Sequence, residues 1–256
     1  MTAAQPRAWT AGPKSPKPLG MKAYGSIPHL PNSRMGPADH HCHPGQEVIC
    51  TVKARDKHDR IIVMEKLDGG CVSVANVGGE IVGLIRAGYT AADAHYEHLR
   101  LFGEWVNENT AAFAHLEPGQ RLVGEWMALA HGTRYAALPS VPFVVFDAFT
   151  GKIRMPLDTV RELAAKAGLD SVAILSDGPA LPVADALARM GGGAYGAEGG
   201  PEGVVYRVER KGEVDFLAKY VRPDKVDGCF LPEVGGCPPQ WHWHSDAALA
   251  KATTQE

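Results

Sequence analysis

The chain has 256 residues, of which 45% are hydrophobic, so it can bury one sizeable core or two small ones and cannot be disordered as a whole. Its 29 Asp and Glu residues outnumber its 26 Lys and Arg residues, and the net charge of −3 excludes binding of nucleic acid or an anionic membrane through a global positive field. The 29 glycines and 19 prolines favour short strands with many turns over a helical bundle.

The composition divides the chain into three parts. Residues 1–21 are rich in Pro, Lys and Ala and predict a disordered lead, with Met21 as a candidate for the functional start. Residues 22–225 contain the periodic segments of a folded domain. Residues 226–256 are rich in Pro and Gly and predict an irregular tail.

Strand patterns dominate the first half of the folded domain. Four β-branched runs, separated by turn residues, predict an antiparallel meander over 47–54, 60–67, 71–77 and 80–87. Residues 91–116 then show apolar residues at roughly helical spacing, which predicts one or two helices.

The second half alternates strands with helices. Its predicted strands occupy 121–129, 143–149, 172–175, 203–209 and 213–221. A helix is predicted over 157–167, because Pro156 precedes it and Gly168 follows it, and a second over 183–190. The Lys-Gly pair at 211–212 is typical of a hairpin turn and predicts that the last two strands pair.

Neither the apolar runs nor the N-terminus predicts a membrane segment or a secretory signal. The longest apolar runs fall far short of the ~20 residues that span a bilayer, and the first twenty residues contain no apolar stretch. The five cysteines are an odd number at irregular spacing, which favours reduced thiols. We therefore expect a cytoplasmic protein with no membrane partner.

The apolar strand that ends in Lys66 is the most informative stretch. Two acidic residues, Glu65 and Asp68, flank this lysine, and the Gly-Gly pair at 69–70 allows close approach of backbone to a ligand. Enclosure, or a neighbouring cation, lowers the pKa of a lysine and frees its amine for nucleophilic attack. Lys66 is thus a candidate nucleophile, although a surface lysine in an acidic turn would have the same local sequence.

Six short motifs follow one another along the predicted strands. They are Lys66-Leu67-Asp68-Gly69, Arg86, Gly124-Glu125, Phe146-Asp147, Glu202-Gly203-Val204-Val205 and Lys219. Each is weak alone, but their order resembles that of covalent nucleotidyltransferases, the superfamily of ATP-dependent RNA and DNA ligases and mRNA capping enzymes. The stretches 24–34 and 130–135 make the resemblance closest to the ATP-dependent RNA ligase domain family, over about residues 22–224.

This resemblance implies an α+β fold, with a nucleotidyltransferase (ATP-grasp-like ligase) core of antiparallel sheets flanked by helices. The adenylation domain would occupy residues 22–225. Because only 37 residues follow Lys219, we expect no C-terminal OB-fold.

The resemblance also implies an ATP-dependent RNA ligase that joins 5′-phosphate and 3′-hydroxyl RNA ends. Lys66 would attack the α-phosphorus of ATP to form lysyl-AMP, the AMP would pass to the RNA 5′ end, and the 3′-hydroxyl would then displace it. ATP and Mg²⁺, or Mn²⁺, are the implied cofactors. A DNA ligase, a capping-type nucleotidyltransferase and a catalytically inactive nucleic-acid end-binding module are the alternatives.

The implied ATP-binding residues are Glu65, Lys66, Arg86, Glu125, Phe146 and Lys219, and the implied metal ligand is Glu202. Phe146 would stack on adenine, Glu65 would line the adenine pocket through its backbone, and Glu125 would accept hydrogen bonds from the ribose hydroxyls. Arg86 would bind ribose or an incoming phosphate. Outside this frame, each of these side chains could equally be an ordinary core or surface residue.

The phosphate side of the implied site departs from the family pattern. Lys219 would bind the α-phosphate and help to depress the pKa of Lys66, and Glu202 is a hard oxygen ligand suited to Mg²⁺. Many relatives have a second lysine separated by one residue from the position of Lys219, and at both such positions this chain has an apolar residue, Leu217 or Val221. Either Lys219 acts alone or Arg222 substitutes.

Two stretches rich in His and Cys leave a metal site open. Residues 39–43 are too contiguous for one tetrahedral centre, and residues 229–244 hold two thiols and two imidazoles that could form a small zinc knuckle. A surface loop and a flexible tail are the default interpretations.

RNA contact must come from a local patch of cations, with a possible accessory subunit for specificity. The candidates are Arg34, Lys53, Arg55, Lys57, Arg60, Arg134, Arg207, Arg210, Lys211, Arg222 and Lys225.

Overall fold

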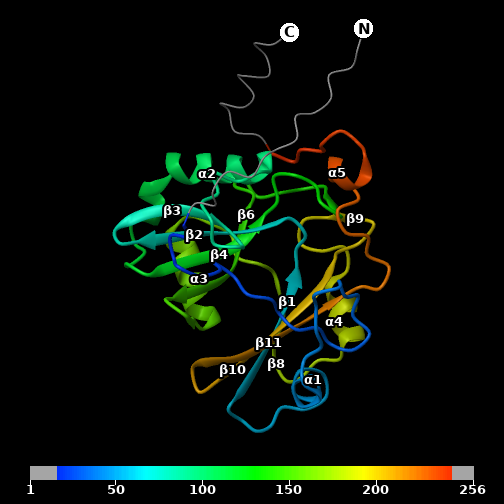
Figure 1. Ribbon diagram of the computed structural model, residues 1–256. Helices are drawn as coiled ribbons and strands as arrows, with labels where there is room; N and C mark the ends of the chain where they lie inside the picture. Colours follow the sequence, from blue (N-terminus) through cyan, green and yellow to red (C-terminus); the bar gives the residue numbers. More distant parts are fainter. Residues whose placement is uncertain (1–15, 244–256) are drawn as a thin grey trace.

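A computed structural model describes residues 16–243 of the chain. Figure 1 shows two twisted sheets, one above the other, with helices against them and with β1 running from the lower sheet toward the upper one. All strand pairs within the sheets are antiparallel. The fold class predicted from the sequence, α+β with antiparallel sheets flanked by helices, is confirmed.

The four-stranded sheet contains, in spatial order, β11 (Glu213–Val221), β10 (Gly203–Arg210), β1 (Asp59–Lys66) and β8 (Ile174–Gly178). Helices α1 (Pro44–Thr51) and α4 (Val183–Met190) cover one face of it, where Ile61, Val63 and Tyr206 are fully buried. The predicted hairpin between the last two strands is confirmed, because Lys211 and Gly212 both adopt positive φ in the connecting turn.

The five-stranded sheet contains, in spatial order, β3 (Glu80–Ile85), β2 (Gly70–Val77), β4 (Gln120–Trp126), β6 (Phe143–Thr150) and β7 (Ile153–Arg154). Helices α2 (Glu97–Glu108) and α3 (Leu157–Lys166), with the short 3₁₀ helix η1 (Thr110–Phe113), pack on one face. The N-terminal segment packs on the other face, where Ala23 and Tyr24 are buried. A separate two-stranded sheet joins β5 (Arg134–Tyr135) to β9 (Ala197–Glu198).

The two sheets share one hydrophobic core. Ile62 and Met64 on β1 are buried in the same cluster as Val74 and Leu122 from the five-stranded sheet. Alternate residues of β1 thus face α1 and α4 on one side and the other sheet on the other side, as the two-residue period of a strand requires. The middle of β1, residues 61–64, must therefore be apolar on both faces, and the strand ends at Lys66 on the boundary between the sheets.

The strand predicted over 47–54 is wrong, because the segment is helix α1. His43 caps this helix: its Nδ1 accepts a hydrogen bond from the backbone N–H of Gly45, and the Gln46 side chain accepts one from the backbone N–H of His43. Pro44 occupies the first turn, where a missing N–H costs nothing. This local capping, together with burial of one apolar face, outweighs the β preference of the branched residues.

The predicted meander is also wrong at one connection. Strands β1 and β2 follow one another in sequence but lie in different sheets, because the chain crosses between the sheets at residues 67–69. Only β2 and β3 form the expected neighbouring pair. The crossing places the Lys-x-Asp-Gly motif at the junction of the two sheets.

Both ends of the described chain contact the folded core. The backbone N–H of Ala23 donates to the carbonyl of Arg86, and Met21 lies close against Gly88. At the other end, residues 226–243 contain the single-turn helix α5 (Pro232–Gly235), and Trp243 packs edge-on against Trp126. None of the helices between residues 16 and 243 is long and apolar enough to cross a membrane.

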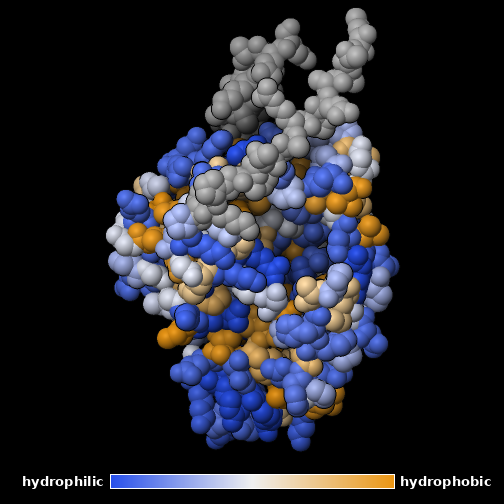
Figure 2. Space-filling view, viewed as in Figure 1, coloured by the Kyte–Doolittle hydropathy of each residue, from blue (hydrophilic) through white to orange (hydrophobic). Residues whose placement is uncertain are grey.

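The end of the four-stranded sheet farthest from the crossing is strongly hydrophilic, as the lower part of Figure 2 shows. Its arginines and aspartates bind one another: Arg55 and Arg210 share the carboxylate of Asp59, and Arg210 also pairs with Asp56 at 2.7 Å. These arginines and aspartates thus neutralise one another within the protein.

Candidate active site

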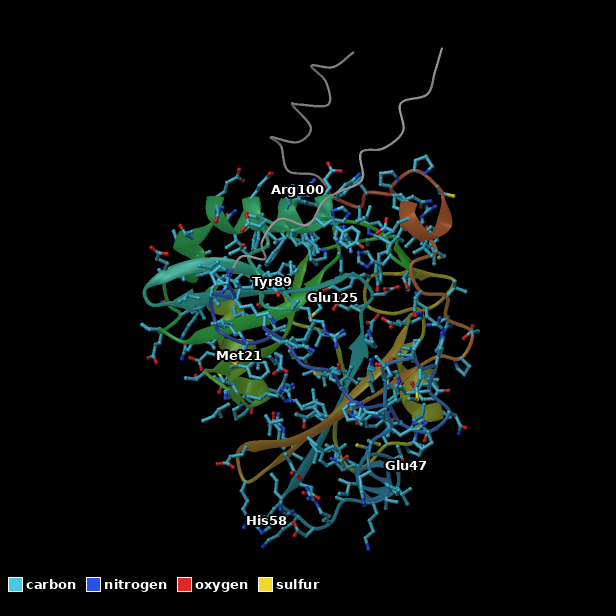
Figure 3. The ribbon with its side chains drawn as sticks, in the orientation of Figure 1. Met21, Glu47, His58, Tyr89, Arg100 and Glu125 are labelled. Carbon is cyan, nitrogen blue, oxygen red and sulfur yellow. The ribbon has the colours of Figure 1, made fainter. Side chains whose placement is uncertain are left out.

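A cavity of about 530 Å³ lies where the two sheets meet, and both sheets supply its walls. Figure 3 places Glu125 near this junction and His58 at the opposite end of the four-stranded sheet. The structure brings all seven candidate residues together around the cavity: Glu65, Lys66, Arg86, Glu125, Phe146, Glu202 and Lys219. They come from six different strands or strand ends, so only the tertiary fold assembles them.

Lys66 is the last residue of β1 and points its amine toward a carboxylate. Its Nζ lies 2.7 Å from Oε2 of Glu202, and it also donates to the carbonyl of Leu67 at 3.4 Å. Glu202 directly precedes β10, whose Gly203 pairs with Lys66 across the sheet. The register between β1 and β10 therefore sets the distance between the two side chains.

The carboxylates around Lys66 control its charge. Burial lowers the pKa of the Lys66 amine, but Glu202, Glu125 and Asp68 together outweigh burial, and the net pKa is raised. The expectation that Lys219 helps to depress the pKa of Lys66 stays a prediction, because in the net shift the carboxylates outweigh every effect that lowers the pKa. Repulsion between the two ammonium groups is mutual, and on Lys219 it is visible: burial first and then Lys66 lower the pKa of Lys219.

Two buried carboxyl groups face the lysine. Burial raises the pKa of Glu125 to about 8, against the opposing effect of Lys66, and burial likewise raises the pKa of Glu202. Oε1 of Glu125 accepts a hydrogen bond from the backbone N–H of Gly69 at 3.0 Å. Burial thus makes both carboxyl groups harder to ionise, and a cation bound beside them would favour their charged forms.

Aromatic and apolar side chains form the other end of the cavity. Phe146 on β6 contacts Tyr24 edge-on, with ring centroids 5.3 Å apart, and both rings line the cavity. Glu65 is buried, and its Oε2 accepts the N–H of Ala194 at 2.8 Å, while its Oε1 has no hydrogen-bond partner within residues 16–243. Gly193 packs so closely on Oε1 of Glu65 that a Cβ there would lie only 2.5 Å away.

The cations of the site are placed at its rim and wall. Arg86 is exposed and donates to Oγ of Ser26 at 3.1 Å and to the carbonyl of Gly25. Lys219 is 15% exposed, and its Nζ lies 3.9 Å from Asp39. Arg222 does not line the cavity: its guanidinium donates to the carbonyl of Gly199 at 2.8 Å. Lys219 is thus the cation that the last motif supplies to the cavity.

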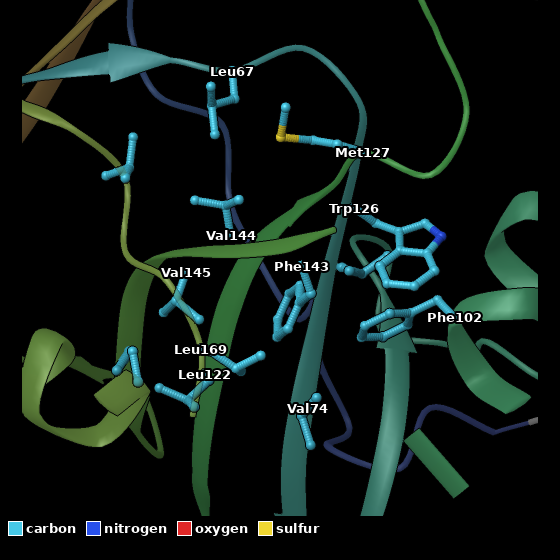
Figure 4. Packing of buried hydrophobic residues seen from close by; sticks show 14 of the residues in the cluster. Leu67, Val74, Phe102, Leu122, Trp126, Met127, Phe143, Val144, Val145 and Leu169 are labelled. Carbon is cyan, nitrogen blue, oxygen red and sulfur yellow. The ribbon is translucent and has the colours of Figure 1, made fainter. Parts of the chain in front are cut away.

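The turn after Lys66 packs against Trp126, a residue of the hydrophobic core. Gly69 packs against the carbonyl of Trp126, where a Cβ would approach the oxygen to 2.5 Å. The Trp126 ring is fully buried, and it contacts Phe102 with centroids 5.3 Å apart (Figure 4). Only glycine fits at this position of the motif.

Known proteins resemble the chain in sequence over the part that carries this cavity. A sequence model of the family described as RNA ligase matches residues 59–221, a range that includes every strand of the four-stranded sheet and all seven candidate residues. The chain belongs to the RNA ligase family. A search of curated proteins found no match.

Solved structures similar to this RNA ligase family member include an archaeal ATP-dependent RNA ligase in its form 2, at 25% identity with a TM-score of 0.44, covering 64% of this chain and 42% of that one. Naegleria gruberi RNA ligase with PPi matches at 17% identity and a TM-score of 0.45, over 64% of this chain and 50% of that one. A mutant of the same enzyme with ATP and Mn matches at 16% identity and 0.49, over 78% and 61%. The chain thus spans 42% to 61% of the length of these structures.

Sequence reasoning missed several residues that line or support the cavity of this RNA ligase family member. Tyr24 and Ile27 lie in the stretch 24–34, and His131 lies in the stretch 130–135. Both stretches resemble the family, but the resemblance implied no role for these three residues. Asp227 and Leu231 also line the cavity, although nothing in the sequence of the tail pointed to the site.

Most of the cations proposed for RNA contact are engaged elsewhere. Arg207 is fully buried between Asp147 and Glu209, and Lys225 is only 6% exposed, so neither can reach RNA. Lys53, Lys57 and Lys211 remain exposed. The prediction is therefore wrong for Arg207 and Lys225, and for the other candidates it stays a prediction. The other six candidates all lie within 4 Å of a carboxylate: Arg34, Arg55, Arg60, Arg134, Arg210 and Arg222.

Among residues 16–243, no three His, Cys, Asp or Glu side chains converge as a preformed metal site. His244, one of the residues of the conceived zinc knuckle, lies outside this range. His242 is engaged with the protein, since its Nε2 accepts the N–H of Tyr135 at 3.2 Å. All five cysteines, which fall within the described range, are free thiols there.

Proposed function

We propose that this member of the RNA ligase family is an ATP-dependent ligase that joins 5′-phosphate and 3′-hydroxyl RNA ends through a covalent Lys66–AMP intermediate. The observation that carries the proposal is the Lys66 amine at the wall of a cavity that also presents Phe146, Glu125 and Lys219. A volume of about 530 Å³ is within the range of small-molecule sites and suits a nucleotide.

In this proposal the aromatic end of the cavity receives adenine and the charged end receives the phosphates. Phe146 offers a ring face for stacking, and the carboxyl of Glu125 can bond to ribose hydroxyls. Lys219 lines the same cavity as Lys66 and supplies positive charge for the α-phosphate. Once the Lys66 ammonium has given up a proton to solvent, a bond forms between its Nζ and the α-phosphorus as the bond from that phosphorus to pyrophosphate breaks.

The donor set around Lys66 fits a divalent ion. Glu202 and Glu125 are buried carboxyl groups whose pKa values burial raises, and a bound divalent cation would favour their ionised, oxygen-donating forms. Mg²⁺ is usually held by one or two carboxylates together with phosphate oxygens and water, so it needs no preformed cluster of protein ligands. We propose that Glu202 holds it, and that Mg²⁺ or Mn²⁺ when bound neutralises charge on the phosphates.

The cheapest decisive test is transfer of label to the protein from ATP labelled at the α-phosphate. Wild type with Mg²⁺ or Mn²⁺ should retain label after denaturation, EDTA should abolish labelling, and Lys66→Ala should not label. Lys152, which is exposed in the turn between β6 and β7, provides the control Lys152→Ala, which should label like wild type. Labelling of Lys66→Ala at the wild-type level would refute the assignment.

The remaining parts of the proposal concern the partner and the setting. RNA with a 5′-phosphate is the proposed substrate, with a separate subunit as a possible source of specificity, and residues 22–225 as the adenylation domain. The free thiols support a reducing compartment such as the cytoplasm. Sealing of nicked RNA by labelled enzyme, compared with nicked DNA and with GTP in place of ATP, distinguishes this function from DNA ligation and capping-type transfer.

A further inference from the structure

Lys225 is a lysine of the C-terminal segment that the fold buries beside the Lys-x-Asp-Gly motif. Its side chain is 4% exposed, and its Nζ lies 2.7 Å from Oδ2 of Asp68. It also donates to the hydroxyl of Thr133, which is itself fully buried. A lysine is rarely buried unless it is paired, so this arrangement needs an explanation beyond surface solubility.

Asp68 is the point at which three parts of the chain meet. The same Oδ2 that pairs with Lys225 accepts hydrogen bonds from the backbone N–H of Gly132 and from Oγ1 of Thr133, each at 3.0 Å. The backbone N–H of Asp68 donates to the hydroxyl of Tyr135 at 2.8 Å. One carboxylate thus holds the turn after Lys66 against the loop 131–135, and Lys225 completes its coordination.

Lys225 also connects this turn to the other side of the cavity. Its backbone N–H donates to the carbonyl of Arg222, whose own N–H donates to the carbonyl of Glu202 at 3.0 Å. The chain from Glu202 to Lys225 to Asp68 therefore spans the crossing between the two sheets. Lys66 lies within this loop of contacts, because it is two residues before Asp68 and bonded to Glu202.

Charge makes the ion pair necessary. Asp68, Glu125 and Glu202 are three acidic groups near the Lys66 amine. Lys225 pairs with Asp68, and its charge also lowers the pKa of Glu202. Without Lys225, the half-buried carboxylate of Asp68 would keep only the neutral donors of Gly132 and Thr133. Rotation of this carboxylate toward the Lys66 amine or toward solvent would then be favoured, and residues 67–69 would move with it.

We infer that Lys225 is a positioning residue for adenylation: by binding Asp68 it holds the turn that follows Lys66, and so holds the nucleophile in place from the segment beyond the last motif. The inference rests on the proposed function of Lys66. Lys225 does not line the cavity, so it acts through Asp68 rather than on ATP. The role also accounts for a buried cation that follows a last motif with only one lysine.

The test compares four full-length proteins in single-turnover adenylation with labelled ATP: wild type, Lys225→Met, Asp68→Asn and the double variant. Lys225→Met should adenylate roughly 10- to 100-fold more slowly at saturating ATP, with the half-saturating ATP concentration changed by less than about 3-fold, because a misplacement near 1 Å affects the reacting geometry more than binding. Lys152→Met is the control and should match wild type.

The double variant separates positioning from a general loss of structure. If Lys225 acts through Asp68, the double variant should be within about 3-fold of Asp68→Asn, since the neutral amide of that variant needs no cation. An equal slowing by Lys225→Met in the wild-type and Asp68→Asn backgrounds, or no slowing in either, would overturn the inference. Should Lys225→Met alone not fold, the comparison of the double variant with Asp68→Asn decides in the same way. A wild type that takes up no label refutes the proposed function instead.

Discussion

The glycine of the Lys-x-Asp-Gly motif offers a direct test of how tightly the turn is held. In Gly69→Ala the new Cβ would lie 2.5 Å from the carbonyl oxygen of Trp126, whereas Cβ atoms essentially never approach closer than 3.0 Å and ordinary contact begins at 3.4 Å. Either Trp126 or the turn must therefore move by about 0.5 to 0.9 Å.

Trp126 is the less movable of the two. Its ring is fully buried, packs against Phe102 and Trp105, and donates through Nε1 to the carbonyl of His98 at 2.9 Å. The turn at residues 67–69 must shift instead, which strains the contacts of Asp68. Because a displacement near 1 Å can cost about 100-fold in rate, we expect adenylation to fall by roughly that factor.

Single-turnover adenylation of Gly69→Ala should be measured at least 10 °C below its melting temperature. Overpacking should also cost about 1–3 kcal/mol of the free energy of unfolding. Gly178→Ala is the matched control, because Gly178 on β8 has no atom within 4 Å of its Cβ position and no positive φ. An adenylation rate for Gly69→Ala within about 3-fold of wild type would show that the turn is not rigid and would refute the reasoning.

Two further predictions concern stability. Arg207→Met removes the fully buried guanidinium that pairs with Asp147 at 3.1 Å and with Glu209 at 2.8 Å. The free energy of unfolding should fall by about 3 kcal/mol, which lowers the melting temperature by about 6–12 °C. A change in melting temperature under about 2 °C would contradict this prediction. His98 has its pKa lowered to about 3, first by burial and then by His131, while an unfolded histidine titrates near 6.5, so the stability that neutral His98 contributes is present above pH 6.5 and is lost as the pH falls below it. His98→Phe should therefore lose less stability between pH 6.5 and 4 than wild type does in urea titrations, and equal losses would count against the assignment.

The sequence by itself determined most of the helices and strands and the candidate residues of the site. Strand β1, the helices α3 and α4 and the β10–β11 hairpin follow from periodicity and turn residues, which are local properties of the chain. The order of the motifs along these strands named the seven candidate residues, all of which line the cavity. Helix α1 was missed although its cap is local, because its apolar residues also satisfy a strand pattern.

Only the tertiary structure decided how these ingredients interact. The crossing of the chain between two sheets at residues 67–69 places the motif, and the burial of Lys225 against Asp68 and the pairing of Arg207 with Asp147 join residues that are far apart in sequence. The raised pKa of Lys66 has the same origin, because it is the balance between burial and three carboxylates supplied by different elements. Local patterns carry no information about such sums, which depend on distances that exist only in the folded chain.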